Sequence, residues 1–363
     1  MSEARKAIYI PANVLHEFVT QCLKDVRVSE SRAKMVADVL LAANLRGIDS
    51  HGVARLRRYV EGARSGKINP DADITVLRES PSTAALDANN GLGQPAAIEA
   101  MRCAIEKAQK TGVGMVTVRR TNHFGIAGYF AMMALEHNMI GVASCNASPQ
   151  VAPTFGIEPM YGTNPIAVAI PTGGGHQFVL DMATSTVPRG RLEQMRRHGK
   201  PLPAGYAIDT DGSSMLNLDE LLEGLVNRRG YSLLPLGGFG EMFGGHKGFG
   251  LGLTVELLCG PLAGAAWGRH VYGQDGANLG HCFQAVSIDC FLPLDEFKAK
   301  TEVLINEIKG SKKVPGSETV YIPGEKERLE AERRSRTGIP LHPDVHADLL
   351  KLAEETNSLA TLG

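Results

Sequence analysis

Hydrophobic positions in the first part of this 363-residue chain repeat at helical spacing. After Ser29, apolar residues recur every three or four positions until Gly47, which predicts a helix that ends at this glycine. A second stripe of the same period begins at Val53, shortly after His51. Two helical patterns therefore meet at a short turn that carries a histidine.

From residue 83 onward the pattern changes, and short apolar runs alternate with helical stretches. This alternation predicts an α/β fold, because strands joined by helices form a sheet that the helices cover. A glycine run at 173–175 separates the apolar runs at 166–170 and 178–180, so these two runs predict a hairpin. The other expected elements are strands at 84–87, 113–118 and 140–146 and helices at 96–110 and after Gly125.

Three further segments differ in composition from this core. Residues 187–229 are rich in proline, glycine and charge, which predicts a surface stretch. Residues 325–336 carry a dense run of both charges, typical of a solvated helix. The apolar span 248–267 contains Glu256 and Pro261, whereas a membrane helix needs about 20 mostly apolar residues. This span predicts a buried, close-packed helix, and we expect no membrane partner.

The overall composition excludes several classes of function. Lys and Arg total 38 against 39 Asp and Glu, so the chain lacks the basic excess of a nucleic-acid-binding protein. Residues 1–6 mix both charges and no apolar stretch follows, which predicts a cytoplasmic protein. The six cysteines form no Cys-x-x-Cys pair and the 11 histidines are dispersed, so we expect no metal site.

Two short runs, DSHG at 49–52 and NHFG at 122–125, place an imidazole where a patterned element begins or ends. His123 follows a predicted strand and precedes a predicted helix, at the edge where ligands bind in α/β sheets. The positive end of a helix favours a neutral imidazole, which can accept a proton. Helix capping is the alternative role for His123. Arg55 lies one helical turn from His51, so one anion can contact both.

Two glycine motifs suggest phosphate binding. The run GLGQPA at 91–96 fits the spacing of a dinucleotide fingerprint, but Arg119 and Arg120 stand where its acidic residue is expected. Pro95 serves equally well as the first residue of an ordinary helix. The run GGHKG at 244–248 lacks the hydroxyl residue of a phosphate loop, yet Lys247 at a helix start can contact a pyrophosphate. Plain loop flexibility explains that run equally well.

Two polar runs flank predicted strands. GTNP at 162–165 precedes one strand, and DMATS at 181–185 follows another. Their hydroxyl, amide and carboxylate groups offer hydrogen bonds to a ligand. Taken alone, Asp181 equally suits the N-cap of the next segment.

In this order, the runs resemble the type 2 malate/L-lactate dehydrogenase family, which includes sulfolactate, ureidoglycolate and diketogulonate oxidoreductases. The resemblance extends over almost the whole chain, and its strength comes from the number of runs in register. The matching runs are DSHGV at 49–53, NGLGQ at 90–94, NHFG at 122–125, GTNP at 162–165, DMATS at 181–185, PLGG at 235–238, GHKGFGL at 245–251 and IPGE at 322–325.

The resemblance implies a mixed α+β, non-Rossmann fold like that of L-sulfolactate dehydrogenase, with a large mixed sheet and a helical portion built from both chain ends. It implies an obligate homodimer, and it makes the glycines at 91–96 structural. The expected domains are a helical domain from residues 1–78 and 315–363 and a cofactor-binding domain from residues 79–314, with a surface insertion at about 187–229.

The resemblance also implies which residues bind ligands. NAD or NADP is expected along His123, Phe124, Gly125, Asp181, Met182, Ala183, Lys247, Pro323, Gly324 and Glu325. A small 2-hydroxy or 2-oxo acid is expected near Ser50, His51, Arg55, Thr163, Asn164 and Arg189. The run TVPRGR at 186–191 departs from many relatives, and its two arginines either bind a second carboxylate or face solvent.

The expected function is NAD(P)-dependent dehydrogenation of a 2-hydroxy acid. Within the family either histidine has been assigned as the acid/base; we favour His51, oriented by Ser50, and place His123 beside the nicotinamide. Arg55 is expected to pair with the substrate carboxylate. A cyclic imino acid reductase and an inactive nucleotide-sensing dimer are the alternatives. The choice of acid and the choice between NAD and NADP stay open.

Overall fold

The computed structural model describes residues 6–175, 177–273 and 276–362. Most of the charged run at residues 1–6, on which the cytoplasmic prediction depends, therefore lies outside the described residues.

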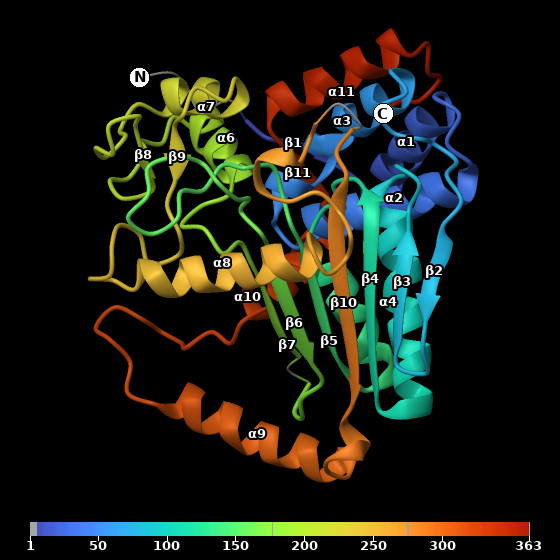
Figure 1. The fold of residues 1–363 in the computed structure, drawn as a ribbon, viewed down its shortest axis with the longest axis vertical. Helices are drawn as coiled ribbons and strands as arrows, with labels where there is room; N and C mark the ends of the chain where they lie inside the picture. The colour runs from blue at the N-terminus through green and yellow to red at the C-terminus, as the bar shows by residue number, and fades with distance from the viewer. Residues whose placement is uncertain (1–5, 176, 274–275, 363) are drawn as a thin grey trace.

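A mixed sheet of seven strands forms the centre of the described structure, in the order β2-β3-β4-β10-β5-β6-β7 (Figure 1). β3 and β4 are parallel, and the other neighbouring pairs are antiparallel. The predicted α/β class and large mixed sheet are confirmed, and β6 and β7 form the predicted hairpin. The strands are β2 (Thr75–Glu79), β3 (Thr83–Asp87), β4 (Val113–Thr121), β5 (Met139–Cys145), β6 (Ile166–Ile170), β7 (Phe178–Met182) and β10 (Leu279–Ser287).

Helices cover both faces of this sheet. α4 (Gly93–Thr111) and α5 (Ala127–Met133) pack on one face, and α8 (Gly245–Cys259) crosses the other (Figure 1). In the central strand β10, Phe283 belongs to the core beneath α4 and α5, whereas Cys282 packs against α8. Successive side chains of a strand point to opposite faces, so a strand covered on both sides is apolar at nearly every position.

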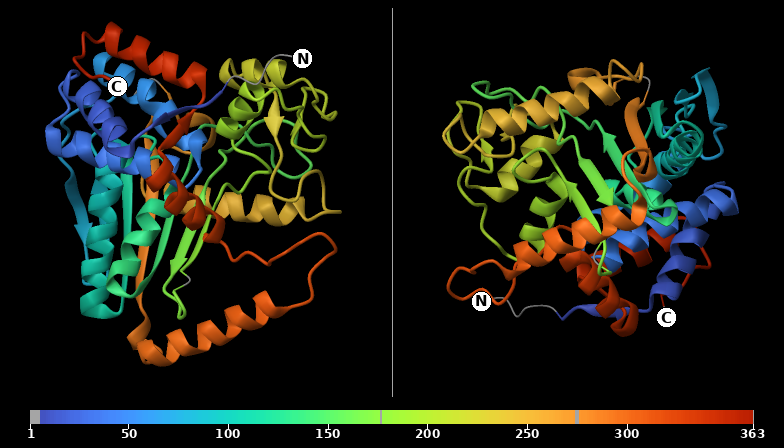
Figure 2. Two further views of the ribbon diagram at one scale, coloured as in Figure 1. Left: turned by 180° about the vertical axis from the view of Figure 1, so that it is seen from behind. Right: turned by 90° about the horizontal axis from the view of Figure 1, so that it is seen from below.

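The two chain ends together form a helical layer. Seen from behind, the carboxyl-terminal helix lies beside the amino-terminal helices (Figure 2). β1 (Ile8–Ile10) pairs antiparallel with β11 (Ile339–Leu341), and the side chains of both ends share one hydrophobic core. This confirms the helical portion predicted from both ends. The other elements of the layer are α1 (Ala12–Lys24), α2 (Glu30–Leu45), α3 (Leu56–Arg64), α10 (Glu325–Thr337) and α11 (Pro343–Glu355).

Residues 187–229, predicted to be a surface stretch, have a small hydrophobic core of their own, and many of their side chains are exposed. This core includes Leu192, Leu221 and Leu233, all fully buried. Gly190 is also buried. It packs closely against Arg55, since an added Cβ would lie 2.6 Å from the Arg55 guanidinium. The prediction missed these short apolar stripes between prolines and charges. The elements are α6 (Arg189–Arg197), α7 (Leu218–Val226), β8 (Ala207–Ile208) and β9 (Ser232–Leu233).

The prediction of a buried helix at 248–267 is wrong for this chain. α8 packs on the sheet with one face only, and Leu257 on its outer face is 54% exposed. α9 (Leu294–Gly310) extends along one end of the molecule, with Ile305 as its one buried residue (Figure 1). None of the described helices has the length and apolar character needed to cross a bilayer.

The glycines at 91–96 have a packing role, as the resemblance implied. α4 begins at Gly93, where an added Cβ would lie 2.2 Å from the Asn122 carbonyl oxygen. At Gly91 an added Cβ would meet Ala72 and the Ala88 carbonyl, each at 2.9 Å. Neighbouring protein atoms fill the space that a pyrophosphate would need, so these glycines form no dinucleotide fingerprint.

Candidate active site

His51 lies in a pair of single-turn 3₁₀ helices between α2 and α3. Its Nδ1 is 2.9 Å from the Ser50 hydroxyl oxygen, within hydrogen-bond distance. Desolvation and, after it, the nearby positive charge of Arg55 lower the pKa of His51 to about 4. The ring is therefore neutral at physiological pH and able to accept a proton.

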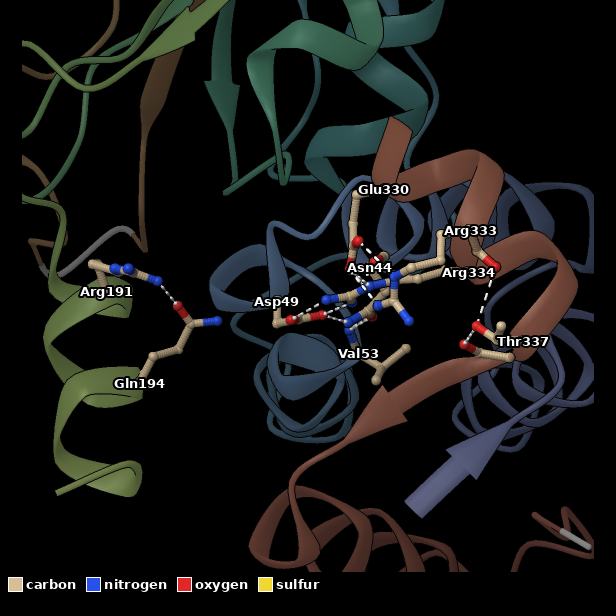
Figure 3. Close-up of polar contacts among 10 residues, drawn as sticks. Asn44, Asp49, Val53, Arg191, Gln194, Glu330, Arg333, Arg334 and Thr337 are labelled. Carbon is tan, nitrogen blue, oxygen red and sulfur yellow. Dashed lines mark hydrogen bonds and ion pairs between the residues drawn. The ribbon is translucent and has the colours of Figure 1, made fainter. Parts of the chain in front are cut away.

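A partly buried polar network links this turn to α10 (Figure 3). Arg334 of α10 donates two parallel hydrogen bonds to the Asp49 carboxylate, at 2.7 and 3.1 Å, and a third at 2.7 Å to the Asn44 carbonyl. The Asn44 amide donates to Asp49 at 2.6 Å and accepts from the Val53 backbone N–H at 2.8 Å. Gly52 is required between them, since its Cβ would lie 2.1 Å from Asn44 Oδ1. The network thus fixes both ends of the turn that carries His51.

His123 follows β4, and its ring stacks on that of His51 with centroids 5.6 Å apart and planes at 16°. The Tyr59 hydroxyl lies 2.6 Å from His123 Nδ1, and the Gly125 N–H donates to the same nitrogen at 3.4 Å. A backbone N–H can only donate, so Nδ1 is an acceptor and the proton of the neutral ring is on Nε2. Desolvation, together with the positive charge of Arg58, holds the pKa of His123 well below its usual range.

A second buried layer supports the His123 loop. His281 of β10 is fully buried, and its Nε2 donates to the Asn122 carbonyl at 3.2 Å. Its ring lies 4.6 Å from that of Phe124, centroid to centroid. Desolvation lowers the pKa of His281 to about 3, so it is a neutral structural residue. Phe124 is 2% exposed and anchors the loop in the core.

Arginines line the same pocket as the two histidines. Arg55 donates to the Ser50 carbonyl at 2.7 Å and to the Glu193 carboxylate at 2.6 Å. Arg189 lies 3.3 Å from the other oxygen of Glu193. Of the predicted substrate residues, the structure brings His51, Arg55, Thr163 and Arg189 into one pocket with His123, Phe124 and Gly125.

Comparison with known proteins identifies the family to which this chain belongs. The family profile described as Malate/L-lactate dehydrogenase matches residues 10–350. The chain belongs to this family. It is 49% identical to the malate dehydrogenase of Pyrococcus abyssi, over 95% of this chain and 94% of that protein. It is 39% identical to the L-sulfolactate dehydrogenase of Methanothermobacter thermautotrophicus, over 93% and 94% of the two chains. The crystal structure of malate dehydrogenase from Entamoeba histolytica superposes on this chain with a TM-score of 0.94 and 37% sequence identity. The superposition covers 97% of this chain and 99% of that one.

Members of the malate/L-lactate dehydrogenase family are oxidoreductases that use nicotinamide cofactors. A second cavity of about 250 Å³ is lined by three of the predicted cofactor residues, Asp181, Pro323 and Gly324, together with Arg46. Gly324 has a φ of +89°, and a side chain there would lie 2.8 Å from Val179. This turn therefore lies directly against the edge strand β7, close to Asp181.

Asp181 links this second cavity to α5. Its carboxylate accepts a hydrogen bond from the Gly128 N–H at 2.8 Å, near the start of that helix. Desolvation raises the pKa of Asp181 to about 6. Met182 and Ala183 follow it and are half-buried. Glu325 accepts from the Ile322 N–H at 3.0 Å and from Lys309 at 2.6 Å, which fixes the turn before α10.

Six predicted site residues line neither cavity: Ser50, Asn164, Met182, Ala183, Lys247 and Glu325. Asn164 is fully buried, and its amide donates to the Gly252 carbonyl and to the Glu256 carboxylate at 2.6 Å. It supports the neighbouring Thr163 from beneath the pocket. Lys247 is exposed in the first turn of α8 and lines neither cavity. The prediction that Lys247 contacts the cofactor stays a prediction.

Four residues of the site were missed in the sequence. Arg58 and Tyr59 are three and four positions after Arg55, so the helical period already placed them on the same side of α3. Glu193 follows Arg189 by four positions, a spacing typical of an ion pair. Tyr272 comes from a glycine-containing loop more than 200 positions after α3, and no local pattern indicated its role.

Proposed function

We propose that this protein is an NAD(P)-dependent 2-hydroxy acid dehydrogenase that uses a histidine as its acid/base. The observation that carries the proposal is a pair of stacked, neutral imidazoles with separate Nδ1 partners, lining one pocket with three arginines. Oxidation of a 2-hydroxy acid needs a proton acceptor beside the hydroxyl and a cation beside the carboxylate. The pocket contains both.

His51 is the proposed proton-transfer residue. Donation from its Nδ1 to Ser50 leaves Nε2 free to accept the proton of the substrate hydroxyl, and the same nitrogen returns a proton in reduction. His123 Nε2–H is proposed to donate to the reacting oxygen, while Tyr59 holds the ring. When bound, the nicotinamide supplies the hydride acceptor in oxidation and the hydride donor in reduction. The residues proposed to hold it are His123, Phe124, Gly125, Asp181, Met182, Ala183, Pro323, Gly324 and Glu325.

Arg55 is proposed to bind the substrate carboxylate. Its replacement by lysine is expected to raise KM for the 2-oxo acid by about 10-fold or more, because an ammonium cannot bond Ser50 and Glu193 while also presenting a planar fork. Steady-state kinetics measure this change. Arg64→Lys, at an exposed position in the helix α3 that follows Arg55, is the matched control. An unchanged KM in Arg55→Lys would remove Arg55 from the substrate site.

The lowered pKa of His51 predicts a pH dependence. Since this pKa is about 4 in the folded protein and ordinarily 6.5, the unfolded chain binds a proton between these values that the folded chain does not. Stability should therefore fall as pH drops through this window, and His51→Gln should reduce the fall. For oxidation, kcat/KM should stay level from about pH 8 to about pH 5, since the base remains neutral. A decline that begins near pH 6.5 would contradict the assignment.

The first test of the function is turnover. Purified protein is mixed with NADH or NADPH, and loss of the reduced cofactor is followed after addition of oxaloacetate, pyruvate, sulfopyruvate or a cyclic imino acid. Reduction of a 2-oxo acid is the expected result. Faster reduction of the imino acid would favour the reductase alternative, and cofactor binding without any turnover would favour a nucleotide-sensing protein.

We also propose a homodimer. Support comes from exposed apolar side chains on α8 and in the segments on either side of it, which would be unusual on a monomer. Light scattering should give twice the mass of one chain, and a monomer at micromolar concentration would contradict the proposal. The side chains are Phe239, Met242, Phe243, Leu251, Leu253, Leu257, Leu262 and Trp267.

The proposed domain division follows the separate hydrophobic cores. The core shared by the two chain ends supports a helical domain of residues 1–78 and 315–363. The core of the sheet with α4 and α5 supports a cofactor-binding domain of residues 79–314, with the unit at about 187–229 as its insertion. The pocket lies between them, since α3 contributes arginines and β4 leads into His123.

A further inference from the structure

A cavity of about 260 Å³ lies beside the turn that carries His51 and shares no lining residue with the substrate pocket. We call it the α6–α11 cavity, because α6 forms one wall and the segment of β11 and α11 forms another. Figure 3 shows Gln194 of α6 and Asp49 of the turn facing one another across this space. None of the residues proposed to bind substrate or cofactor lines it, so the cavity is not part of the site described above.

Three hydrogen-bond donors line the α6–α11 cavity. Arg197 is half-buried, and among the residues that the structure describes none forms an ion pair or a hydrogen bond with its guanidinium. The amide oxygen of Gln194 accepts from Arg191 at 3.2 Å, which leaves its NH₂ group available to a ligand. The Nδ1 of His342 accepts from the Asp344 N–H at 3.2 Å, so in the neutral ring Nε2 carries the proton and can donate. The cavity therefore favours a ligand that accepts hydrogen bonds.

The lining combines one positive charge that has no paired carboxylate with an apolar surface. Its charged residues are Asp49, Arg197 and Arg334, and Arg334 neutralises Asp49 through two parallel hydrogen bonds. The charge of Arg197 is therefore left for a ligand. Most of the other lining residues are apolar, namely Ala7, Val53, Ala54, Pro340, Leu341, Pro343 and Val345. A carboxylate that carries a small apolar group matches both parts of this surface, because it pairs with the cation and buries apolar area.

This cavity and the substrate pocket share their walls. Ala54 of the turn lines the cavity, whereas the next residue, Arg55, lines the pocket. In α6, Arg197 follows Glu193 by one helical turn, and Glu193 accepts a hydrogen bond from Arg55. Desolvation lowers the pKa of Arg197, the charge of Glu193 opposes this shift and the charge of Arg55 adds to it, so the three charges interact. An anion that neutralises Arg197 should therefore leave Glu193 more strongly paired with Arg55, and should weaken the binding of an anionic substrate at Arg55.

We propose that the α6–α11 cavity is a regulatory site, which binds a small carboxylate with an apolar body through Arg197 and thereby weakens substrate binding in the neighbouring pocket. The guanidinium of Arg197 offers the carboxylate two parallel hydrogen bonds, and Gln194 and His342 offer further donors. Binding of the carboxylate is independent of the proposed dehydrogenase function, whereas its effect on the substrate rests on that function.

The binding test uses benzoate as the probe, with benzamide as a neutral molecule of the same shape and acetate as a carboxylate without the apolar ring. By calorimetry the wild type should bind benzoate about 10-fold more tightly than either of the other two. Arg197→Met should abolish the preference for benzoate over benzamide. Arg196→Met is the matched control, since Arg196 is the exposed neighbour on α6, does not line the cavity and should leave the preference unchanged. The anomalous signal of 4-bromobenzoate in crystals locates the probe directly.

Equal binding of benzoate and benzamide by the wild type would overturn the site even if the variants fail to fold. Bromine located in the substrate pocket, or an unchanged preference in Arg197→Met, would overturn it as well. These measurements need no turnover, so they still decide the proposed site if no 2-oxo acid is reduced, a result that would contradict only the dehydrogenase function.

Steady-state kinetics with a 2-oxo acid test the effect on the substrate. Increasing benzoate should raise KM to a plateau about fivefold above its starting value, the low end of typical couplings between two sites. By linkage, the 2-oxo acid should weaken benzoate binding by the same factor. A KM that rises in proportion to benzoate without a plateau would indicate direct competition in the substrate pocket and overturn the proposal. An unchanged KM at saturating benzoate would overturn the regulatory role.

Discussion

Replacing His51 with glutamine is expected to lower kcat for 2-hydroxy acid oxidation by about 10²- to 10⁴-fold, the usual contribution of a positioned acid/base. Glutamine preserves the approximate size of the side chain and its bond to Ser50, but it accepts no proton at the pH of the assay. Cofactor affinity should change little, because the proposed cofactor residues lie around Gly125, Asp181 and Gly324. Stopped-flow measurement of the hydride-transfer step and fluorescence titration of the reduced cofactor check the two parts.

His123→Gln is the matched comparison for this experiment. The buried Tyr59 holds the His123 ring, and His123 is also among the residues proposed to hold the cofactor, so the variant should lose turnover and weaken the binding of substrate and cofactor. Normal turnover in His51→Gln, with turnover abolished in His123→Gln, would exchange the two assignments. Normal turnover in both variants would contradict a histidine acid/base.

Replacing Arg334 with methionine is expected to have the second large effect, although Arg334 lies outside the pocket. The change leaves the Asp49 carboxylate without its two parallel hydrogen bonds and removes the bond to the Asn44 carbonyl. We expect a loss of about 3 kcal/mol in the free energy of unfolding, the low end for breaking a buried pair, because Asp49 stays 32% exposed. Because Asp49 adjoins Ser50, the freed turn should also lower kcat more than it raises KM. Urea unfolding and steady-state kinetics measure the two effects.

Arg333→Met provides the control, since Arg333 is the sequence neighbour of Arg334 and also bonds Glu330, but does not contact the turn (Figure 3). Its side chain is 44% exposed, so it should lose at most about 1 kcal/mol and keep normal kcat. Equal effects of the two variants would show that Arg334 acts only through the stability of α10 and has no separate role in positioning His51.

The elements and the two histidines were predictable because their signals are local. Helical and alternating periods placed α2, α4 and β4, and the runs DSHG and NHFG placed His51 and His123 at element ends. Arg55 was predicted to lie near His51 because it follows His51 by one helical turn. Arg58 and Tyr59 were open to the same argument, since a residue three or four positions along a helix lies on the same side.

The remaining features depend on contacts between distant segments. Arg334 and Asp49 are separated by 285 positions, and the charged helix that contains Arg334 had the composition of a purely solvated one. Asn164 carries polar groups typical of a binding residue, but Glu256 on α8 binds its amide in the core. The apolar span that contains α8 predicted burial correctly for one face only, because an apolar composition does not show which face of a helix packs against the sheet.

The most direct test of the central claim follows the hydrogen itself. The protein is incubated with a 2-oxo acid and reduced nicotinamide cofactor that carries deuterium at the transferable ring position, and the product is analysed by mass spectrometry. We predict one deuterium on the carbon that bears the new hydroxyl group, with the transfer nearly lost in His51→Gln. A product without deuterium, or no product from any of the tested acids while the cofactor binds, would contradict hydride transfer as the function of this site.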